Sequence, residues 1–385
     1  SQNRRRRFQD SRIYQEIFDE IVLQAMGYDL VGGEVLYTDS THLKANANKN
    51  KYDLKQAEEK VAAYLDSLED AIEGDRKAQG KKPLKSKLSE QPPKTKDTKI
   101  SRTDPDSGYM VREGKPKGFF YLDHRTVDGR NAIITDSYAT PANLHASRPY
   151  LDRLDRQCER FGFDVWGVGL DAGYYTAGIC KGLEDRGLYG VMGYRRPNKP
   201  KGYLPKRAFT YDPETNSYRC PQGQQLIYAT TNRLGYREYK SNPTNCKDCP
   251  LLSQCTRSAN HVKVLTRHVW QDSKDRTDSY RLTPWGKALY KRRQETVERS
   301  FADAKQLHGH RYARLRGLSK VREQCLLAAA AQNMKKIAQI LARLLWLKSF
   351  GMPDLQGQIR KWARKMACLA YWQSDREYWA QSIAN

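Results

Sequence analysis

The sequence predicts an α/β fold in which a mixed β-sheet is flanked by helices, with a small Cys-rich insertion before a late helix. Three observations predict this class. Short apolar runs bounded by turn residues are typical of strands, and longer runs with apolar residues at helical spacing alternate with them. Four of the eight cysteines lie within 220–255, between the last predicted strand and that late helix.

The N-terminal third contains two expected helices and one strand. Apolar residues at helical spacing predict a helix over Ile13–Met26, and Glu34–Asp39 reads as a short strand. An amphipathic, charged helix is expected over Tyr52–Ile72. Residues 74–99 are rich in Lys and Pro and have almost no large apolar side chain, so we expect a mobile loop there.

The central part predicts a compact sheet with covering helices. Asp128-Gly129 is a strong hairpin-turn signal between two strand-like runs, Phe119–Val127 and Ala132–Tyr138. Helices and strands then alternate in the order helix His145–Phe161, strand Asp164–Leu170, helix Ala177–Arg186 and strand Leu188–Tyr194. After a Pro- and Cys-containing segment, helices are expected over Trp285–Leu307 and Leu318–Leu347.

These elements suggest five segments along the chain. They are a basic and helical N-terminal segment (1–33), a first catalytic part (34–199), a Cys-rich insertion (200–284), a second catalytic part (285–347) and a basic C-terminal tail (348–385).

The composition narrows the class of partner. The 385 residues carry 68 Lys and Arg against 44 Asp and Glu, a formal net charge of +24, which favours a polyanion such as nucleic acid. The most apolar stretch, Leu326–Ala331, is far too short to span a membrane. No apolar run follows the N-terminal arginines, so they do not form a secretory signal. The cysteine content favours metal ligands or buried thiols over a disulfide framework.

Three carboxylates occupy positions that suit metal-dependent chemistry. Asp39 and Asp171 each end a predicted strand, and Glu298 lies on the helix after the insertion. If the two strands are parallel neighbours, both Asp side chains lie at one sheet edge, where open α/β sheets build their sites. Carboxylates are ligands for Mg²⁺, and a pair of such ions can stabilise the entering and leaving oxygens of a phosphodiester. Taken singly, each acid is equally well explained as an ordinary surface residue.

The surrounding motifs resemble those of a known family. They are Thr38-Asp-Ser-Thr-His-Leu-Lys-Ala-Asn-Ala-Asn48, Thr103-Asp-Pro-Asp-Ser-Gly108, Thr140-Pro-Ala-Asn143, Asp171-Ala-Gly-Tyr174 and Thr296-Val-Glu-Arg-Ser-Phe-Ala-Asp-Ala-Lys305. With them the chain resembles the DDE transposases of bacterial insertion sequences, in the branch with a cysteine-containing insertion between the second Asp and the Glu.

The resemblance implies a fold, an activity and partners. The expected fold is ribonuclease H-like, and Asp39, Asp171 and Glu298 fall on the catalytic positions that bind Mg²⁺ or Mn²⁺. The expected activity is strand cleavage at transposon ends followed by strand transfer into target DNA. A homodimer on DNA, in the bacterial cytoplasm and associated with the nucleoid, is expected as the working form, with no membrane partner.

The chain departs from the family pattern at three places. Ala146 follows His145 where relatives carry an Asp, which we expect to affect folding or fine positioning. Tyr290 and Arg293 lie one residue too far upstream of Glu298 for the family's Tyr-Arg-Glu-Lys signature, although Lys305 has the expected spacing. Relatives also carry a helical domain before the first Asp, and we expect this chain to lack most of it.

Basic and aromatic residues near the triad are candidates for DNA contacts. Those expected to hold DNA phosphates are His42, Lys44, Arg292, Arg293, Arg299, Lys305 and Arg311. The alternative is a solvated helix surface. For Trp270 and Trp285 we expect core packing, with stacking on a flipped base as the alternative.

The insertion carries a candidate structural zinc site. Cys220, Cys246, Cys249 and Cys255 supply four thiols, and the Cys-x-x-Cys spacing lets two sulfurs reach one tetrahedral ion. Buried free thiols or a redox pair remain the alternative, and His261 could replace one Cys. Cys158, Cys180, Cys325 and Cys368 are expected to be small core residues.

Two other functions keep the same site residues. One is a catalytically silent, transposase-derived DNA-binding protein, and the other is a ribonuclease H-like nuclease without strand transfer. Nicking of supercoiled plasmid with Mg²⁺ or Mn²⁺ separates the first from an enzyme, and a strand-transfer product separates the second.

Overall fold

The computed structural model describes Phe8 and residues 11–58, 64–86, 95–112, 114, 116–194 and 202–349. Contacts divide the chain into two compact units, Ser1–Gln332 and Asn333–Asn385. Within the described ranges, the first unit holds all the strands and every site described below. Among the described residues, no helix is both long enough and apolar enough to cross a membrane.

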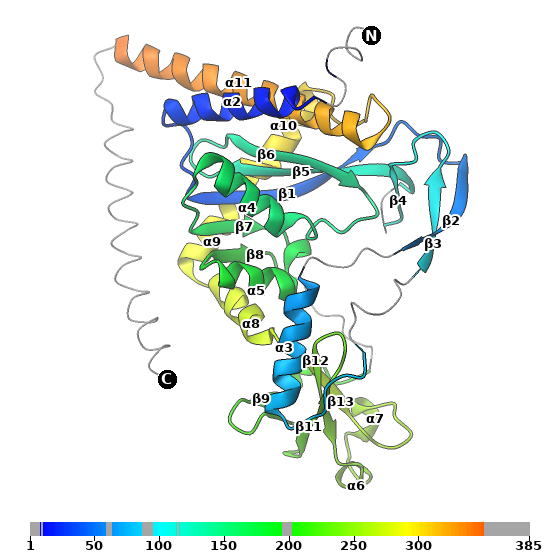
Figure 1. Ribbon diagram of the computed structural model, residues 1–385. Helices are drawn as coiled ribbons and strands as arrows, with labels where there is room; N and C mark the ends of the chain where they lie inside the picture. Colours follow the sequence, from blue (N-terminus) through cyan, green and yellow to red (C-terminus); the bar gives the residue numbers. More distant parts are fainter. Residues whose placement is uncertain are drawn as a thin grey trace. The chain divides into compact units, whose positions relative to one another are not determined.

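A six-stranded mixed sheet forms the centre of the first unit. Its strands are β1 (Val35–Lys44), β4 (Gly108–Met110), β5 (Gly118–Asp128), β6 (Ile134–Pro141), β7 (Gly167–Leu170) and β8 (Tyr189–Met192). β1 lies between β5, which is antiparallel to it, and β7, which is parallel to it, and β8 continues the sheet beside β7 (Figure 1). β4 and β6 both pair with β5.

Helices cover both faces of this sheet. They are α2 (Ile13–Gly27), α4 (Tyr150–Phe161), α5 (Ala177–Asp185), α9 (Pro284–Arg292), α10 (Arg299–Leu307) and α11 (Leu318–Ser349), with short helical turns η1 (Ala172–Tyr174) and η3 (Gln294–Glu298). Side chains alternate along β1, so Leu36 packs with Leu154 and Ile179 of α4 and α5, whereas Leu43 packs with Val321 and Cys325 of α11. The expected mixed sheet flanked by helices is confirmed.

The segment expected as an insertion forms a second, antiparallel sheet. Its strands are β9 (Thr210–Asp212), β10 (Ser217–Arg219), β11 (Gln225–Thr231), β12 (Tyr236–Ser241) and β13 (Val264–His268), accompanied by η2 (Lys206–Ala208), α6 (Pro243–Cys246), α7 (Leu252–Cys255) and α8 (Gln271–Tyr280). Tyr218, Leu226 and Tyr239 form its core. Asp75 of α3 (Leu65–Ala78) anchors it by pairing with Arg237.

Two expectations for the segment between 52 and 101 are wrong. Residues Tyr52–Glu58 form strand β2 rather than the start of a helix, because they pair with β3 (Thr95–Ser101), a partner about forty residues away. The expected loop 74–99 is occupied at its ends by the last turn of α3 and most of β3. The helix forms because Leu68 and Ile72 pack against Trp270. Residues 87–94 of that expected loop lie outside the described residues.

Several element boundaries also differ from expectation. β1 does not end at Asp39 but continues to Lys44, because β5 pairs with it as far as Phe120. α4 begins at Tyr150 rather than His145, directly after Pro149. The expected continuous helix Trp285–Leu307 is divided by η3, which has π-helical hydrogen bonding. The helices expected at Ile13–Met26 and Ala177–Arg186 and the 119–138 hairpin are confirmed.

Candidate active site

The two aspartates lie side by side at one edge of the sheet. β1 and β7 run parallel, and their last paired residues are Thr38 and Leu170. Asp39 and Asp171 follow directly, so both residues lie at the level where the parallel pairing of the two strands ends, although β1 itself continues to Lys44. Asp39 is held by the backbone N–H of Ser40, which donates to its Oδ1 at 2.7 Å. The side chain of Asp39 is 22% exposed and that of Asp171 is 51% exposed.

Glu298 reaches the same edge from η3, which packs against β1 and β5. Thr296 and Val297 of this turn are buried, and Val297 is completely inaccessible to solvent. Burial of these two neighbours fixes the turn on the sheet and leaves the Glu298 side chain 47% exposed. Two aspartates from adjacent parallel strands and one helical glutamate are therefore brought to one region, although their carboxylate oxygens do not all lie within 4.8 Å of one another.

Arg293 lies between the three carboxylates. Its Nη2 is 2.9 Å from Asp39 Oδ2, and its Nη1 is 3.6 Å from Glu298 Oε1 and 3.9 Å from Asp171 Oδ1. Nη1 also donates to the hydroxyl of Tyr290 at 3.2 Å. The Arg293 side chain is only 3% exposed. Arg293 is expected to hold a DNA phosphate, but in this structure its guanidinium is buried and faces the three carboxylates.

The π-helical turn explains the departure in spacing noted in the sequence. The Glu298 N–H donates to the Arg293 carbonyl at 3.1 Å, a bond over five residues rather than the four of an α-helix. In an α-helix, residues five apart point about 140° away from each other. The wider turn absorbs the extra residue and brings Arg293 and Glu298 together. Arg293 thus lies beside both Tyr290 and Glu298 despite the extra residue.

The electrostatics of this edge leave excess negative charge. Burial raises the pKa of Asp39. The guanidinium of Arg293 and the Ser40 N–H lower that pKa, and the neighbouring carboxylates of Asp171 and Glu298 raise it again. The resulting pKa of Asp39 is about 6. One guanidinium therefore does not neutralise three acids. A further cation at this edge would be stabilised by the same three carboxylates.

A cavity of about 400 Å³ opens beside the carboxylates. Asp39 and Glu298 line it together with Lys305 and Arg311. The expectation that Glu298 and Lys305 project from one face is confirmed by this shared cavity. Two of the seven basic residues expected near the triad therefore lie where a phosphate at the carboxylates would meet them.

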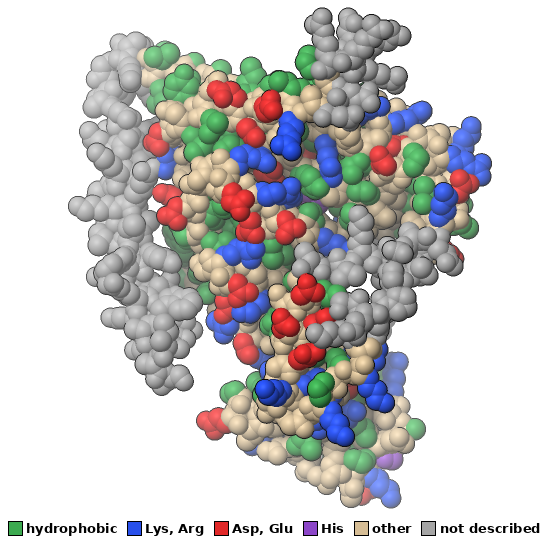
Figure 2. Space-filling model, in the orientation of Figure 1, with side chains coloured by type: hydrophobic (Ala, Val, Ile, Leu, Met, Phe, Trp, Pro, Cys, Tyr) green, Lys and Arg blue, Asp and Glu red, His purple; other side chains and the backbone are tan. Residues whose placement is uncertain are grey.

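The other basic candidates have different surroundings. His42 projects from the opposite face of β1 to Asp39, and its ring packs edge-on against Phe120. Arg292 donates to the carbonyl of Arg130 at 3.3 Å. Lys44 is exposed at the end of β1. Figure 2 shows Lys and Arg intermixed with Asp and Glu on the visible face, so the basic excess is not gathered there in one patch.

Arg299 and the two tryptophans complete the set of candidates. Arg299 is exposed and pairs with Asp303 at 3.0 Å on its own helix. Trp270 is buried against Tyr64, which confirms core packing. The same expectation is wrong for Trp285, which is about half exposed and stacks on Trp166.

The four cysteines of the insertion come near one another. Burial raises the pKa of the Cys255 thiol, and the ammonium of Lys263 lowers it. The thiols of Cys246, Cys220 and Cys249 raise this pKa further, which requires all three to lie close to Cys255. Two of them begin tight turns, since Gly223 N–H donates to the Cys220 carbonyl and Cys249 N–H to that of Cys246. No three of these sulfurs lie within 4.8 Å of each other in the described chain.

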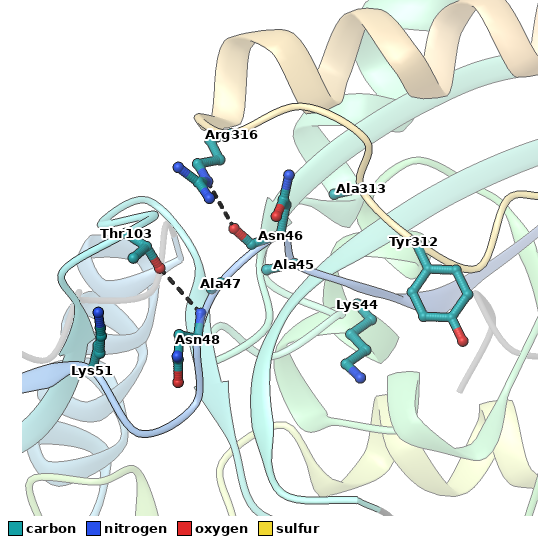
Figure 3. Close-up of a pocket in the computed structure, with 10 residues that line it drawn as sticks. All are labelled: Lys44, Ala45, Asn46, Ala47, Asn48, Lys51, Thr103, Tyr312, Ala313 and Arg316. Atoms are coloured by element: carbon teal, nitrogen blue, oxygen red, sulfur yellow. Dashed lines mark hydrogen bonds between the residues drawn. The ribbon is translucent and has the colours of Figure 1, made fainter.

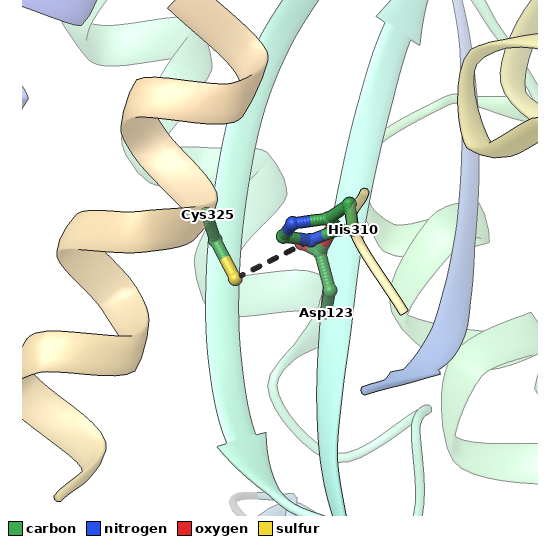
Figure 4. Close-up of side chains that lie close together, drawn as sticks. All are labelled: Asp123, His310 and Cys325. Carbon is green, nitrogen blue, oxygen red and sulfur yellow. Dashed lines mark hydrogen bonds and ion pairs between the residues drawn. The ribbon is translucent and has the colours of Figure 1, made fainter. Parts of the chain in front are cut away.

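A buried polar cluster on β5 was missed in the sequence. Asp123 Oδ2 lies 2.9 Å from both Arg125 Nε and His310 Nε2, and Cys325 Sγ is 3.9 Å from that same His310 nitrogen (Figure 4). Asp123 and Arg125 are completely buried. The available signal was two opposite charges inside the apolar strand 119–127, because buried charges require partners.

This cluster is better explained as structural than as a metal site. Asp123, His310 and Cys325 are the only metal-ligand types whose donor atoms group this closely in the part of the chain that the structure describes. However, the Asp123 oxygen that would face an ion already accepts from Arg125 and His310, and the guanidinium beside it repels a cation.

A comparison with known protein families finds a match for the later part of the chain, which contains Glu298. Residues 219–338 match the model of a family described as the transposase DDE domain. The match includes Glu298, Arg293, Lys305 and the four cysteines, and it does not reach Asp39 or Asp171. No curated protein matches the chain. The family match, read together with the carboxylate geometry, supports a DDE transposase.

Proposed function

We propose that this protein is a DNA transposase of the insertion-sequence type, which cleaves transposon ends and transfers the strands into target DNA with divalent metal ions. One observation carries the proposal: Asp39, Asp171 and Glu298, from three separate elements, converge on a single cationic group. The +24 formal charge supports DNA as the partner.

The order of the central sheet supports a ribonuclease H-like catalytic domain. The strands run β6, β5, β1, β7, β8, and β5 alone is antiparallel to the other four. In this arrangement the two aspartates come from adjacent parallel strands, β1 and β7. The glutamate comes from a helical turn that packs on β1, after the second sheet.

The donor set fits Mg²⁺ or Mn²⁺. Carboxylate oxygens are the hard ligands these ions prefer, and Asp39, Asp171 and Glu298 already surround the guanidinium of Arg293 as a stand-in cation. These three residues would hold the ions. When bound, such ions stabilise charge on the entering and leaving oxygens of the phosphodiester.

The chain's own residues have separate roles around the carboxylates. Lys305 and Arg311, which line the cavity with Asp39 and Glu298, would hold the phosphate of the strand to be cut. Arg293 compensates part of the negative charge and keeps the three acids at one point before DNA arrives.

We also propose a structural Zn²⁺ in the insertion, held by Cys220, Cys246, Cys249 and Cys255. The influence of the other three thiols on Cys255 and the two tight turns support it. Purified protein is expected to contain about one Zn²⁺ per chain, and Cys246→Ser to reduce that content. Elemental analysis without zinc, on protein never exposed to chelators, would contradict this part of the proposal.

The catalytic test compares two glutamates on the same turn. Glu298→Gln should abolish nicking of supercoiled plasmid in Mg²⁺ or Mn²⁺, whereas Glu295→Gln, an exposed neighbour on η3, should keep it. Mn²⁺ binding measured without DNA should weaken in Glu298→Gln alone. Nicking by Glu298→Gln at the wild-type rate would contradict the assignment.

The products then separate the three candidate functions. A transposase gives strand-transfer products joined to target DNA, and a nuclease of the same fold gives cleavage alone. A silent DNA-binding protein binds DNA with no metal-dependent cleavage. The working form we propose, a homodimer on DNA, is checked by the mass of the complex with end DNA in solution.

A further inference from the structure

A second cavity lies near the candidate active site and contains none of its carboxylates. Its volume is about 570 Å³, and it opens between the end of β1, the 103 loop and the loop before α11 (Figure 3). The charged, amide and aromatic residues on its wall are Lys44, Asn46, Asn48, Lys51, Tyr312 and Arg316. Two of the sequence motifs, 38–48 and 103–108, contribute residues to this cavity, and none of those residues belongs to the carboxylate triad.

Hydrogen bonds between distant segments hold the wall of this cavity in place. The Lys44 N–H donates to the Arg311 carbonyl at 3.0 Å, and the Ala313 N–H donates to the Lys44 carbonyl at 2.7 Å. Arg316 Nε donates to the Asn46 carbonyl at 3.0 Å (Figure 3).

The loop before α11 is itself fixed from the other side. Asp104 accepts from the Gly317 N–H at 3.0 Å, and Asp106 accepts from the Leu318 N–H at 2.9 Å, at the start of α11. Asp104 in turn accepts from the buried hydroxyl of Tyr121. Apart from the Tyr121–Asp104 bond, each of these hydrogen bonds involves at least one backbone group, so the fold itself forms the cavity wall.

The lining has the chemistry of a nucleotide site. Of the ten residues on the cavity wall, all of them described, three are cations and none is acidic, so the cavity favours an anion. The Tyr312 ring is 57% exposed, and the ammonium of Lys44 lies 5.8 Å from its centre. An exposed aromatic ring beside cations and side-chain amides suits a base stacked on the ring, with its phosphate on the cations.

The cavity is continuous in the chain with the carboxylate edge. β1 carries Asp39 to the first cavity and Lys44 to the second, with the two side chains on opposite faces of the strand, and the neighbours Arg311 and Tyr312 divide between the cavities in the same way. Five residues of strand span about 17 Å. That distance corresponds to about five steps of a B-form strand at 3.4 Å each, and to fewer steps of an unstacked strand.

We propose that this second cavity binds one unstacked nucleotide of the DNA strand whose phosphodiester lies at Asp39, Asp171 and Glu298. The base stacks on Tyr312, its edge meets the amides of Asn46 and Asn48, and its phosphate lies between Lys44 and Arg316. The inference rests on the proposed function and adds a subsite to it, two to five nucleotides from the cut.

The test measures binding of the full chain to an eight-nucleotide single strand in EDTA, where no metal-dependent cleavage occurs. Tyr312→Ala should weaken binding about 5- to 150-fold, the range for loss of one stacked base. Tyr312→Phe keeps the ring and should bind within about twofold of wild type. Tyr28→Ala, a control at a tyrosine of nearly equal exposure (56%), should have no effect.

Photocrosslinking locates the base. A single 5-iodouracil is moved along the strand, and a crosslink to Tyr312 is expected from one position or two adjacent ones. Unchanged affinity of Tyr312→Ala, or crosslinks to Tyr312 from every position alike, would overturn the proposal. Full competition by a free deoxynucleoside monophosphate would also overturn it, because it would indicate a mononucleotide site.

The outcomes distinguish this inference from the proposed function. If wild type nicks plasmid with metal while Tyr312→Ala binds normally, the transposase assignment stands and the subsite is wrong. If Tyr312 crosslinks at one position but no metal-dependent cleavage is found, the subsite stands and the enzymatic assignment fails.

Discussion

Two carboxylate–arginine groups in the same fold differ in how completely the acid is neutralised. On β5, Asp123 is fully buried and its Oδ2 is shared by Arg125 and His310. At the candidate active site, the guanidinium of Arg293 is shared among three acids.

The pKa values of the two groups move in opposite directions. Burial alone would raise the pKa of Asp123, but Arg125 and His310 outweigh it and hold that pKa at about 2. At the site, burial dominates and the pKa of Asp39 is about 6. A buried acid with sufficient partners stabilises the fold, whereas acids with too few partners are prepared to bind another cation.

The largest expected effect comes from removing the buried arginine. Arg125→Met leaves Asp123 buried without its main partner, so the free energy of unfolding should fall by about 3–5 kcal/mol. Arg293 is also buried, but its three carboxylate partners are 22–51% exposed and water can solvate them, so Arg293→Met should cost less than Arg125→Met. Urea unfolding monitored by circular dichroism measures both.

A double variant sharpens this result. Asp123→Leu combined with Arg125→Met removes both charges together and should be less destabilising than Arg125→Met alone, because no uncompensated charge remains. Equal losses of stability for Arg125→Met and Arg293→Met would contradict the contrast between the two groups.

The second prediction concerns added metal. Mg²⁺ at about a hundred times its dissociation constant should raise the free energy of unfolding by about 2.7 kcal/mol. The gain should vanish in Asp171→Asn and persist in Asp123→Asn, measured against each variant's own metal-free value. A gain that depends on Asp123 would instead assign the ion to the buried cluster.

The smallest effect is acid destabilisation by the buried cluster. Because the folded pKa of Asp123 lies near 2, below its ordinary value of 3.8, its contribution is complete above about pH 4 and is lost as the pH falls toward 2. The expected loss is about 2 kcal/mol. Arg125, His310 and Cys325 face this carboxylate. In Asp123→Asn the free energy of unfolding should no longer show this loss between about pH 4 and 2. If the loss persists in that variant, other groups cause it.

Local sequence patterns determined a large part of this fold. The turn residues Asp128-Gly129 between two alternating runs were enough to predict the β5–β6 hairpin, and helical spacing predicted α2 and α5. The positions of Asp39, Asp171 and Glu298 relative to the predicted elements also indicated one shared edge. These features depend on residues close together in the chain, where periodicity reports directly on which side is buried.

Only the tertiary structure decided the remaining features, because each depends on a partner far away in the sequence. Tyr52–Glu58 is a strand since it pairs with Thr95–Ser101, although its own pattern suits a charged helix. The inward position of Arg293 requires both the π-helical turn and the three acids that attract it. Whether an arginine in this basic chain binds DNA or a neighbouring carboxylate is decided by which charges the fold brings within a few ångströms, and spacing along one segment does not contain that information.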